Sequence, residues 1–438
     1  MDEIKRVEPR TLSGFLELLP QDQIKFNEML DIIRKTYELY GFLPQETPIV
    51  EASEVLLAKA GGETEKQIYS FKKGDKNLSL RFDLTVPLAK YVAQYYNELT
   101  FPYRRYQTGK VFRGERAQKG RYKEFYQCDI DIIGDGKLSI LNDAEIPSII
   151  ATTFKNLGFD KFIIKINNRK ILNGLFKSLN LEDKAADILI VVDKLEKIGL
   201  DEVKTELVSL NVKSEAIKVI EEFLTITGTT DEKVKKLEDM NLKEKEFLTG
   251  IEELKEVIKY VRLFNVKDEN FIVDLTIARG LDYYTGTVYE TNIIGYEKMG
   301  SVCSGGRYEN LAEYYTKKSL PGVGISIGLT RLFYQLKELG LLKTKRKSIS
   351  KVAIVTMDVE VENAVEISNL LRENGVINEI YKEDSKLKAK FSYANNLEIP
   401  YMIIIGEDEV KKEKFTLKNM ETGDQELLSK SEILEKLI

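Results

Sequence analysis

Hydrophobic residues recur at helical spacing between Gln21 and Tyr40, and Gly41 follows them directly. This pattern predicts an amphipathic helix that ends at the glycine. Pro48 then precedes a short apolar strand and the start of a second helix. From Leu78 to Thr85 apolar and polar residues alternate, and Asp83 and Thr85 end the polar set. A period of two predicts a strand with one apolar and one polar face.

A basic loop lies between two further strand-like segments. Residues 111–113 have strand character, a loop with glycine and lysine follows, and another strand spans Phe125 to Ile133. Along that strand Gln127, Asp129 and Asp131 share one side, whereas apolar residues occupy the other. Strand, loop and strand in this order predict an antiparallel hairpin rather than a parallel βαβ unit. We therefore expect the chain to bind its ligands on an antiparallel sheet.

The rest of the chain divides into regions of different character. Residues 168–261 are helical and Lys/Glu-rich, which predicts a helical insertion. Strand character resumes at Phe271, so residues 1–167 and 262–342 are expected to form one interrupted domain. Residues 351–438 alternate β and α segments without a phosphate-binding glycine loop, which predicts a small α/β domain that serves as a binding module.

The amino-acid composition excludes several classes of catalytic site. The chain has 438 residues, a net charge of −5 and no histidine. Without imidazole, neither a histidine-dependent nucleophile nor a histidine metal site is possible, so triad and zinc hydrolases are excluded. The two cysteines, Cys128 and Cys303, lack zinc spacing and are expected to be buried thiols. No apolar run is long enough to span a membrane and the N-terminus has no signal-peptide core, which predicts a cytoplasmic protein.

The basic loop is the first candidate for chemistry. Arg113 ends a strand, where its guanidinium could bind phosphate through paired donors at any working pH. Glu115 could accept a hydrogen bond from an amino group such as that of adenine, and Phe125 on the returning strand could stack a base. A surface hairpin with ordinary ion pairs is an equally good interpretation of this segment alone.

Two later segments are weaker candidates on their own. In TIARGLDYYTG, Arg279 precedes a glycine that permits close approach of a ligand, and Tyr283 and Tyr284 combine an aromatic body with a hydroxyl group. A strand end with packed tyrosines is the alternative. In GVGISIGLTR, three glycines leave space above a strand before Arg331 begins a helix. This is not a dinucleotide fingerprint, and glycines used only for tight helix packing are the alternative.

Taken together, these segments resemble the motifs of class II aminoacyl-tRNA synthetases in their usual order. Pro48 fits motif 1, VFRGERAQKGRYKEF fits motif 2 and GVGISIGLTR fits motif 3. ARGLDYYTGTVYE and SGGRYENL are similar to the two signature motifs of histidyl-tRNA synthetases, and LRFDLTVPLAKYVA and EFYQCDIDIIG also resemble that family. The resemblance implies an α+β fold: the class II antiparallel sheet with flanking helices, the helical insertion, and a C-terminal α/β anticodon-binding domain.

The resemblance also implies roles for ATP-binding residues. Arg113 would hold the α-phosphate, Glu115 and Phe125 the adenine, and Arg331 the γ-phosphate. Arg121 would approach the triphosphate. Arg279 would lie against the α-phosphate, so that Arg113 and Arg279 are the expected catalytic residues, with Mg²⁺ accompanying ATP and no metal site formed by the protein alone.

Further implied roles concern histidine and tRNA. The α-amino group of histidine would meet Asp83, Thr85 and Gln127, and its imidazole would meet Asp131 and Tyr284. Arg279 and Tyr283 would complete the histidine site. Arg116 and Gln118 would approach the acceptor end of tRNA(His). Two residues depart from the family pattern: Ala117 replaces a usual proline, and Asp83 replaces a glutamate that is common in bacterial members.

The implied function is a histidine–tRNA ligase that forms histidyl-adenylate from L-histidine and ATP and is expected to be a homodimer. The main alternative is the synthetase-like regulatory subunit of ATP phosphoribosyltransferase, which keeps the fold without the activity. That protein usually lacks the C-terminal module and has lost motif arginines, whereas Arg113, Arg279 and Arg331 are present here. A retired synthetase that senses tRNA or histidine is a third possibility that the sequence leaves open.

Overall fold

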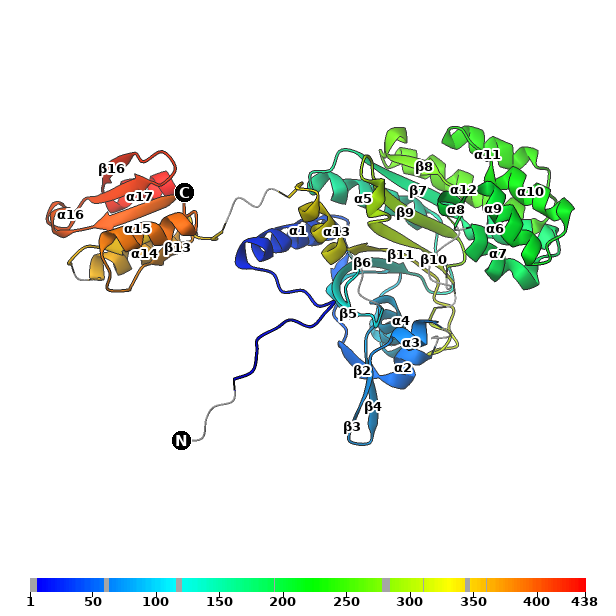
Figure 1. Ribbon diagram of the computed structural model, residues 1–438, viewed down its shortest axis with the longest axis horizontal. Coiled ribbons are helices and arrows are strands. Elements are labelled where there is room, and N and C mark those ends of the chain that lie inside the picture. The colour runs from blue at the N-terminus through cyan, green and yellow to red at the C-terminus, as the bar shows by residue number, and fades with distance from the viewer. Residues whose placement is uncertain are drawn as a thin grey trace. The chain divides into compact units, whose positions relative to one another are not determined.

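The computed structural model describes residues 6–58, 63–115, 120–192, 194–277, 284–309, 311–342, 347–359 and 361–438. The chain divides into two compact units, one of Met1–Leu16 with Met29–Leu339 and the other of Glu17–Glu28 with Gly340–Ile438. No helix of the described residues is long and apolar enough to cross a membrane. Helices and strands are labelled in Figure 1 where there is room.

An eight-stranded sheet forms the centre of the first unit. Its strands, in spatial order, are β1 (Leu43–Pro44), β5 (Tyr103–Phe112), β6 (Glu124–Ile133), β11 (Gly322–Gly328), β10 (Cys303–Tyr308), β9 (Thr287–Ile293), β7 (Phe162–Asn168) and β8 (Phe271–Val273). The strands from β5 to β7 pair antiparallel, whereas β1 and β8 join the two edges in parallel. The expected antiparallel hairpin is therefore confirmed as β5 and β6.

A small sheet and several helices accompany the large sheet. The small sheet consists of β2 (Val50–Ala52), β4 (Lys76–Leu80) and β3 (Ser70–Lys73). The helices are α1 (Pro20–Leu39), α2 (Ser53–Leu57), α3 (Glu63–Gln67), α4 (Thr85–Gln94), α5 (Leu141–Asn156) and α13 (Leu329–Glu338). Short 3-10 turns lie at Tyr96–Glu98, Glu182–Lys184, Asp268–Asn270 and Glu297–Met299.

Two predictions at the N-terminal end have different outcomes. The helix predicted to end at Gly41 is confirmed as α1, and Gly41 has a φ of 75°, a conformation that favours glycine. The strand predicted from Leu78 to Thr85 is wrong beyond Leu80, because Thr85 is already the first residue of α4. Asp83 Oδ1 accepts the backbone N–H of Val86 at 2.9 Å, and this side-chain hydrogen bond turns the chain into the helix.

The two faces of β6 differ, as the alternation predicted. The face of Cys128, Ile130 and Ile132 is fully buried, and the Tyr37 hydroxyl of α1 donates to the carbonyl oxygen of Cys128 at 3.1 Å. Cys128 and Cys303 are both buried free thiols, as expected. The opposite face carries the side chains of the candidate site.

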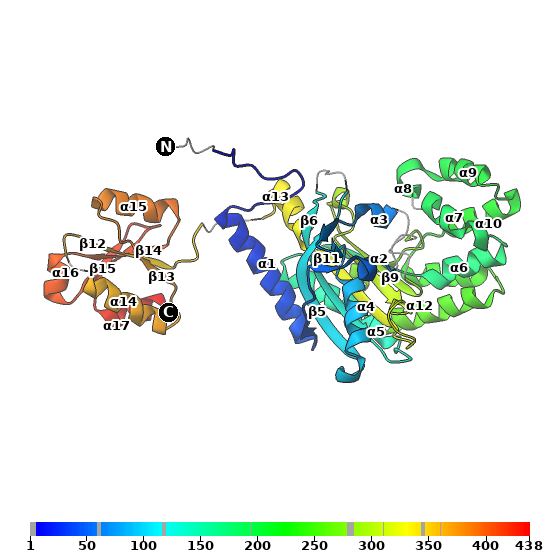
Figure 2. The same ribbon diagram turned by 90° about the horizontal axis from the view of Figure 1, so that it is seen from below.

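Helices fill the region expected to be an insertion. They are α6 (Arg169–Ser178), α7 (Ala185–Val192), α8 (Leu195–Ile198), α9 (Leu200–Ser209), α10 (Ser214–Leu224), α11 (Thr230–Asp239) and α12 (Lys245–Leu263). Both ribbon views show them as one group (Figures 1 and 2), and Figure 1 shows this group beside β7 and β8. Local signals define their ends: the Thr229 hydroxyl accepts from the backbone N–H of Glu232, and the Glu232 carboxylate accepts in return, so that a capping box begins α11.

The second unit contains a five-stranded sheet covered on both faces. Its strands, in spatial order, are β13 (Asn378–Ile380), β12 (Val352–Thr356), β14 (Tyr401–Ile405), β15 (Phe415–Asn419) and β16 (Gln425–Leu428). Its helices are α14 (Glu362–Glu373), α15 (Leu387–Asn396), α16 (Glu407–Lys412) and α17 (Lys430–Leu437). One core joins a sheet face to α14 and α17, and a second core joins the other face to α15. This is the α/β domain expected from the sequence.

A buried ion pair holds β10 to the start of α5. Arg307 Nη2 lies 2.7 Å from Asp143 Oδ1, and the two side chains are 6% and 0% exposed. Two hydroxyl groups of β9 also donate to Asp143. The Thr287 hydroxyl donates to its Oδ2 at 2.7 Å, and the Tyr289 hydroxyl donates to its backbone carbonyl oxygen at 2.7 Å. These contacts fix the strand that carries the neighbouring Tyr308.

We expect Arg307→Ala to destabilise the first unit by about 3–5 kcal/mol, because it leaves the Asp143 carboxylate buried without its cation. Urea unfolding followed by circular dichroism measures this loss. The matched control is Arg34→Ala, which removes an exposed pair with Asp31 and should cost less than about 1 kcal/mol. Equal losses in both variants would show that the buried pair contributes nothing special to stability.

Candidate active site

A cavity of about 410 Å³ opens on the polar face of the large sheet. Its floor comes from β6, β11 and β10, and its wall from the segments around Asp83, Arg113 and Arg331. Ten predicted site residues line it: Asp83, Thr85, Arg113, Glu115, Arg121, Phe125, Gln127, Asp131, Tyr284 and Arg331. The other four, Arg116, Gln118, Arg279 and Tyr283, lie outside the described residues. The individual roles of all fourteen stay predictions.

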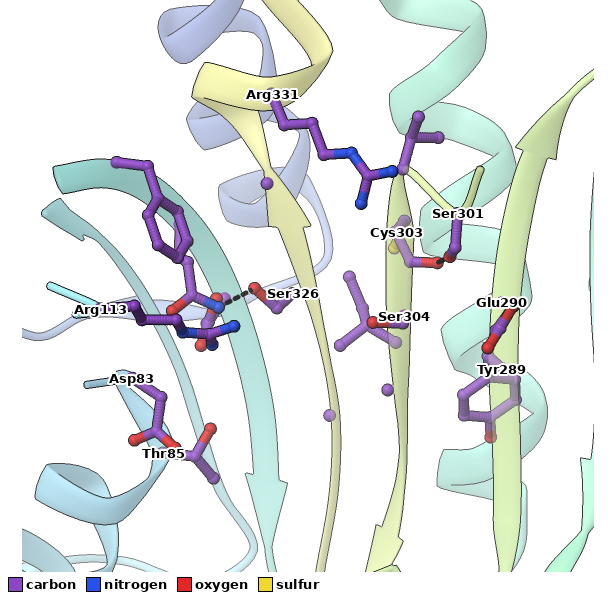
Figure 3. A pocket seen from close by; sticks show the side chains of 18 of the residues that line it. Asp83, Thr85, Arg113, Tyr289, Glu290, Ser301, Cys303, Ser304, Ser326 and Arg331 are labelled. Atoms are coloured by element: carbon purple, nitrogen blue, oxygen red, sulfur yellow. Dashed lines mark hydrogen bonds between the residues drawn. The ribbon is translucent and has the colours of Figure 1, made fainter. Parts of the chain in front are cut away.

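The cationic side chains enter the cavity from three segments. Arg113 follows β5, donates from Nε to the carbonyl oxygen of Phe82 at 3.3 Å, and stacks 4.3 Å and 5.1 Å from the rings of Phe82 and Phe125. Arg331 lies in the first turn of α13 and donates to the carbonyl oxygen of Met299 at 2.6 Å. In the close-up view Arg113 lies between Arg331 and Asp83 (Figure 3). These contacts hold the guanidinium groups in defined positions before any ligand binds.

Electrostatics indicate an anion site near Arg331. Burial lowers the pKa of Arg331, and the positive charge of Arg121 lowers it further. Arg121 is also paired with Glu115 across 3.3 Å. Two mutually repelling guanidinium groups on one cavity wall are stabilised when a polyanion such as a triphosphate binds between them.

Buried carboxylates occupy the floor. Asp83, Asp129 and Asp131 are 5%, 2% and 3% exposed, and all three line the cavity. Burial raises the pKa of all three carboxyl groups, that of Asp129 to about 7 and that of Asp131 to about 6. The positive charge of Arg105 lowers each pKa, but by less than burial raises it. An uncompensated negative potential of this kind favours a cationic ligand group.

Asp131 is held by two buried neighbours. Arg105 Nη2 of β5 lies 2.7 Å from its Oδ2, and the Tyr308 hydroxyl of β10 donates to its Oδ1 at 2.8 Å. The sequence interpretation missed both neighbours as site residues. Tyr308 lies within the SGGRYENL motif, which was a usable signal. Arg105 was not detectable, because only the pairing register places it opposite Asp131.

Glycines on β11 and β10 leave room above the carboxylates of the cavity floor. A Cβ atom on Gly324 would lie 2.3 Å from Asp131 Oδ1, and one on Gly305 would lie 2.1 Å from the carbonyl oxygen of Gly324. A side chain at either position would clash with the floor. The glycines of β11 and β10 therefore let a ligand lie close to the sheet and to the Asp131 carboxylate. This explains the glycines of GVGISIGLTR without a dinucleotide-binding loop.

The fold and this arrangement of charges define a class II aminoacyl-tRNA synthetase: an antiparallel sheet with motif arginines on one cavity wall. The histidyl-tRNA synthetase family model matches residues 14–332, and an anticodon binding domain model matches residues 351–438. This chain belongs to the histidyl-tRNA synthetase family.

Individual relatives extend over the whole chain. The histidine–tRNA ligase of Clostridium tetani is 57% identical over 430 residues, with 98% of each chain covered, and that of Finegoldia magna is 51% identical over 431 residues, with 98% of this chain and 100% of that protein covered. The crystal structure of histidyl-tRNA synthetase from a Nostoc species superposes with a TM-score of 0.91 at 42% identity and covers 99% of each chain. An ATP phosphoribosyltransferase regulatory subunit/histidyl-tRNA synthetase from Bacillus halodurans, with a TM-score of 0.75 at 21% identity and 92% and 99% of the chains covered, shares the fold.

The raised pKa of Asp129 predicts a pH-dependent stability. Its folded pKa of about 7 exceeds the ordinary value of about 3.9 in an unfolded chain, so its stabilising contribution is complete below pH ~4 and is lost as the pH rises through 7. Asp129→Asn carries no charge and escapes this loss. We expect the melting temperature of the variant, relative to wild type without ligand, to increase by a few degrees between pH 5 and pH 8. Differential scanning calorimetry of both proteins measures it. A constant or decreasing difference contradicts the assigned direction.

Proposed function

We propose that this protein is a histidine–tRNA ligase, which activates L-histidine with ATP and transfers it to tRNA(His). The observation that carries the proposal is that one cavity combines three arginines with three buried carboxylates. The arginines suit a triphosphate, and the carboxylates suit an amino acid whose ammonium and imidazole groups are both nitrogen donors. Family membership and full-length relatives named histidine–tRNA ligase support the same conclusion.

The first step needs no proton-abstracting residue. A carboxylate oxygen of histidine attacks the α-phosphorus, the bond from that phosphorus to the bridging oxygen breaks, and pyrophosphate leaves. Arg113 would stabilise the negative charge on the α-phosphate, and Arg331 and Arg121 would hold the leaving phosphates. Catalysis then consists of positioning and charge stabilisation, which agrees with a chain that has no histidine.

Histidine would lie over the sheet with its ends separated. Asp83, Thr85 and Gln127 would accept its ammonium group, and Asp131 and Tyr284 would hydrogen-bond its imidazole. In the second step the terminal ribose hydroxyl of tRNA attacks the acyl carbon, AMP leaves, and a phosphate oxygen of the adenylate takes the proton. Arg116 and Gln118 stay the predicted contacts of the tRNA acceptor end, and Arg279 and Tyr283 stay predicted substrate contacts.

Magnesium would arrive with ATP. No cluster of three potential metal ligands is present among the described residues, and Mg²⁺ on a nucleotide needs only one or two protein carboxylates besides the phosphates. Glu290 on the cavity wall could supply one of these. When bound, the ion neutralises phosphate charge.

The homodimer and the cytoplasmic location are also proposals. The segment assigned to motif 1 exposes apolar residues: Ile49 and Val50 are 42% and 41% exposed, and Phe71 on the same small sheet is 45% exposed. Apolar side chains gathered in this way favour a contact with a second copy.

We expect the protein to catalyse histidine-dependent exchange of labelled pyrophosphate into ATP, because adenylate formation is reversible. Arg113→Ala should reduce the exchange rate roughly 100-fold or more while the protein stays folded. A folded wild-type protein without exchange would contradict the enzyme assignment. If it still bound histidine, the result would favour the regulatory-subunit alternative.

Asp131→Ala should raise the histidine KM in the same assay roughly 10- to 100-fold, because the imidazole loses its carboxylate partner. The matched control is Asp135→Ala, which changes an exposed aspartate just beyond the same strand and should leave the KM unchanged. An unaltered KM for Asp131→Ala would reject this residue as the partner of the ring.

A further inference from the structure

Asp129 lies in the floor of the cavity but is absent from the predicted substrate contacts. It lies on β6 between Gln127 and Asp131, on the same face, and is 2% exposed. Its register partner across β11 is Ser326. The side chain therefore belongs to the cavity floor rather than to the hydrophobic core.

Ser326 of β11 lies beside both Gln127 and Asp129. Gln127 Nε2 donates to Ser326 Oγ at 2.7 Å (Figure 3), Ser326 is the register partner of Asp129, and its hydroxyl acts to lower the pKa of that carboxyl group. Gln127 and Asp129 are two residues apart on the same face of β6, and Ser326 is the neighbour of both side chains. One donor group could contact both.

One oxygen atom of each side chain has no protein partner among the described residues. Gln127 Oε1 and Asp129 Oδ1 are both fully buried acceptors without a hydrogen bond there. Buried acceptors without a donor are costly, so two of them on one strand face of a ligand cavity indicate that the ligand supplies the donors. At Asp131, in contrast, Arg105 and Tyr308 already donate to one oxygen each.

The charges around Asp129 favour a cation. Asp83 from the segment before α4, Asp131 of its own strand and Arg105 of β5 are the charged groups that act on Asp129. Arg105 acts on all three carboxyl groups and Arg113 acts on Asp83, so the carboxylates outnumber the guanidinium groups among the described residues. An incoming ammonium group offsets part of this excess, whereas a neutral group does not.

We propose that Asp129 is a further substrate-binding residue, which contacts the α-ammonium group of histidine together with Gln127. The inference rests on the proposed function, since it assigns a contact to that substrate. An ammonium group has three tetrahedrally arranged N–H donors and a full charge, so it can meet an amide oxygen and a carboxylate oxygen at once. An imidazole ring has at most two N–H groups, which point in opposite directions in one plane.

Two adenylate analogues that differ only at the α-position test the assignment on the full chain. One is histidyl-sulfamoyl-adenosine, and the other is its imidazolelactyl counterpart, which has a hydroxyl group in place of the ammonium group. We expect Asp129→Asn to weaken binding of the first roughly 10- to 100-fold and of the second less than about 3-fold. Asp131→Asn, which affects the ring, should weaken both. Asp135→Asn is the matched control and should change neither. Calorimetric titration measures these affinities.

Ser326→Ala keeps the Asp129 carboxylate but removes the hydroxyl that holds the Gln127 amide beside it. It should weaken binding of the histidyl analogue alone, by roughly 3- to 10-fold, and it tests the inference even if Asp129→Asn fails to fold. The inference is overturned if these variants bind the histidyl analogue as wild type does, or lose affinity for both analogues equally. A wild-type protein that binds neither analogue would instead overturn the proposed function, together with this contact.

Discussion

Removing a carboxylate from water is unfavourable unless a cation or several hydrogen bonds replace the lost hydration. Asp83, Asp129 and Asp131 are nevertheless all buried; Arg105 acts on all three of them, and Arg113 acts on Asp83 as well. The raised pKa values of these carboxyl groups show that the compensation is incomplete. An ammonium group placed here would stabilise the site, so under the proposed contact the imbalance that reduces the stability of the free protein would also favour the substrate.

Contacts elsewhere in the large sheet hold the buried carboxylates in position. Because neighbouring strands of the large sheet pair antiparallel, Arg105 lies directly opposite Asp131 on one side, and Gly324 lies opposite it on the other. The glycine lets the carboxylate lie flat against the sheet and leaves the space above it for a ligand. Arg307, buried against Asp143, fixes the strand that presents the Tyr308 hydroxyl to the same carboxylate. Under the proposed function, substrate binding and the stability of the sheet would therefore depend on shared contacts.

Residue patterns predicted the strands of the site and most of its side chains, but not the contacts that depend on pairing between distant strands. Alternation along β6 correctly separated the face of Gln127 and Asp131 from the core, since a period of two is a local property of an extended chain. The same rule failed at Thr85, because the Asp83 side chain ends the extended segment by hydrogen bonding to the backbone. Arg105 and the free oxygen of Asp129 depend on register between strands distant in sequence, which no local pattern contains. Tyr284 reached the cavity as the resemblance implied, but its contact with the ring stays a prediction.

The central claim is that one cavity orients the substrate, with phosphate toward the arginines and the amino acid over the carboxylates. A crystal structure of the protein with histidyl-sulfamoyl-adenosine tests it most directly. We expect the sulfamoyl group beside Arg113, the imidazole at Asp131, and the ammonium nitrogen within about 3 Å of oxygen atoms of both Gln127 and Asp129. A reversed analogue, or an ammonium group that is remote from these acceptors, would contradict the account.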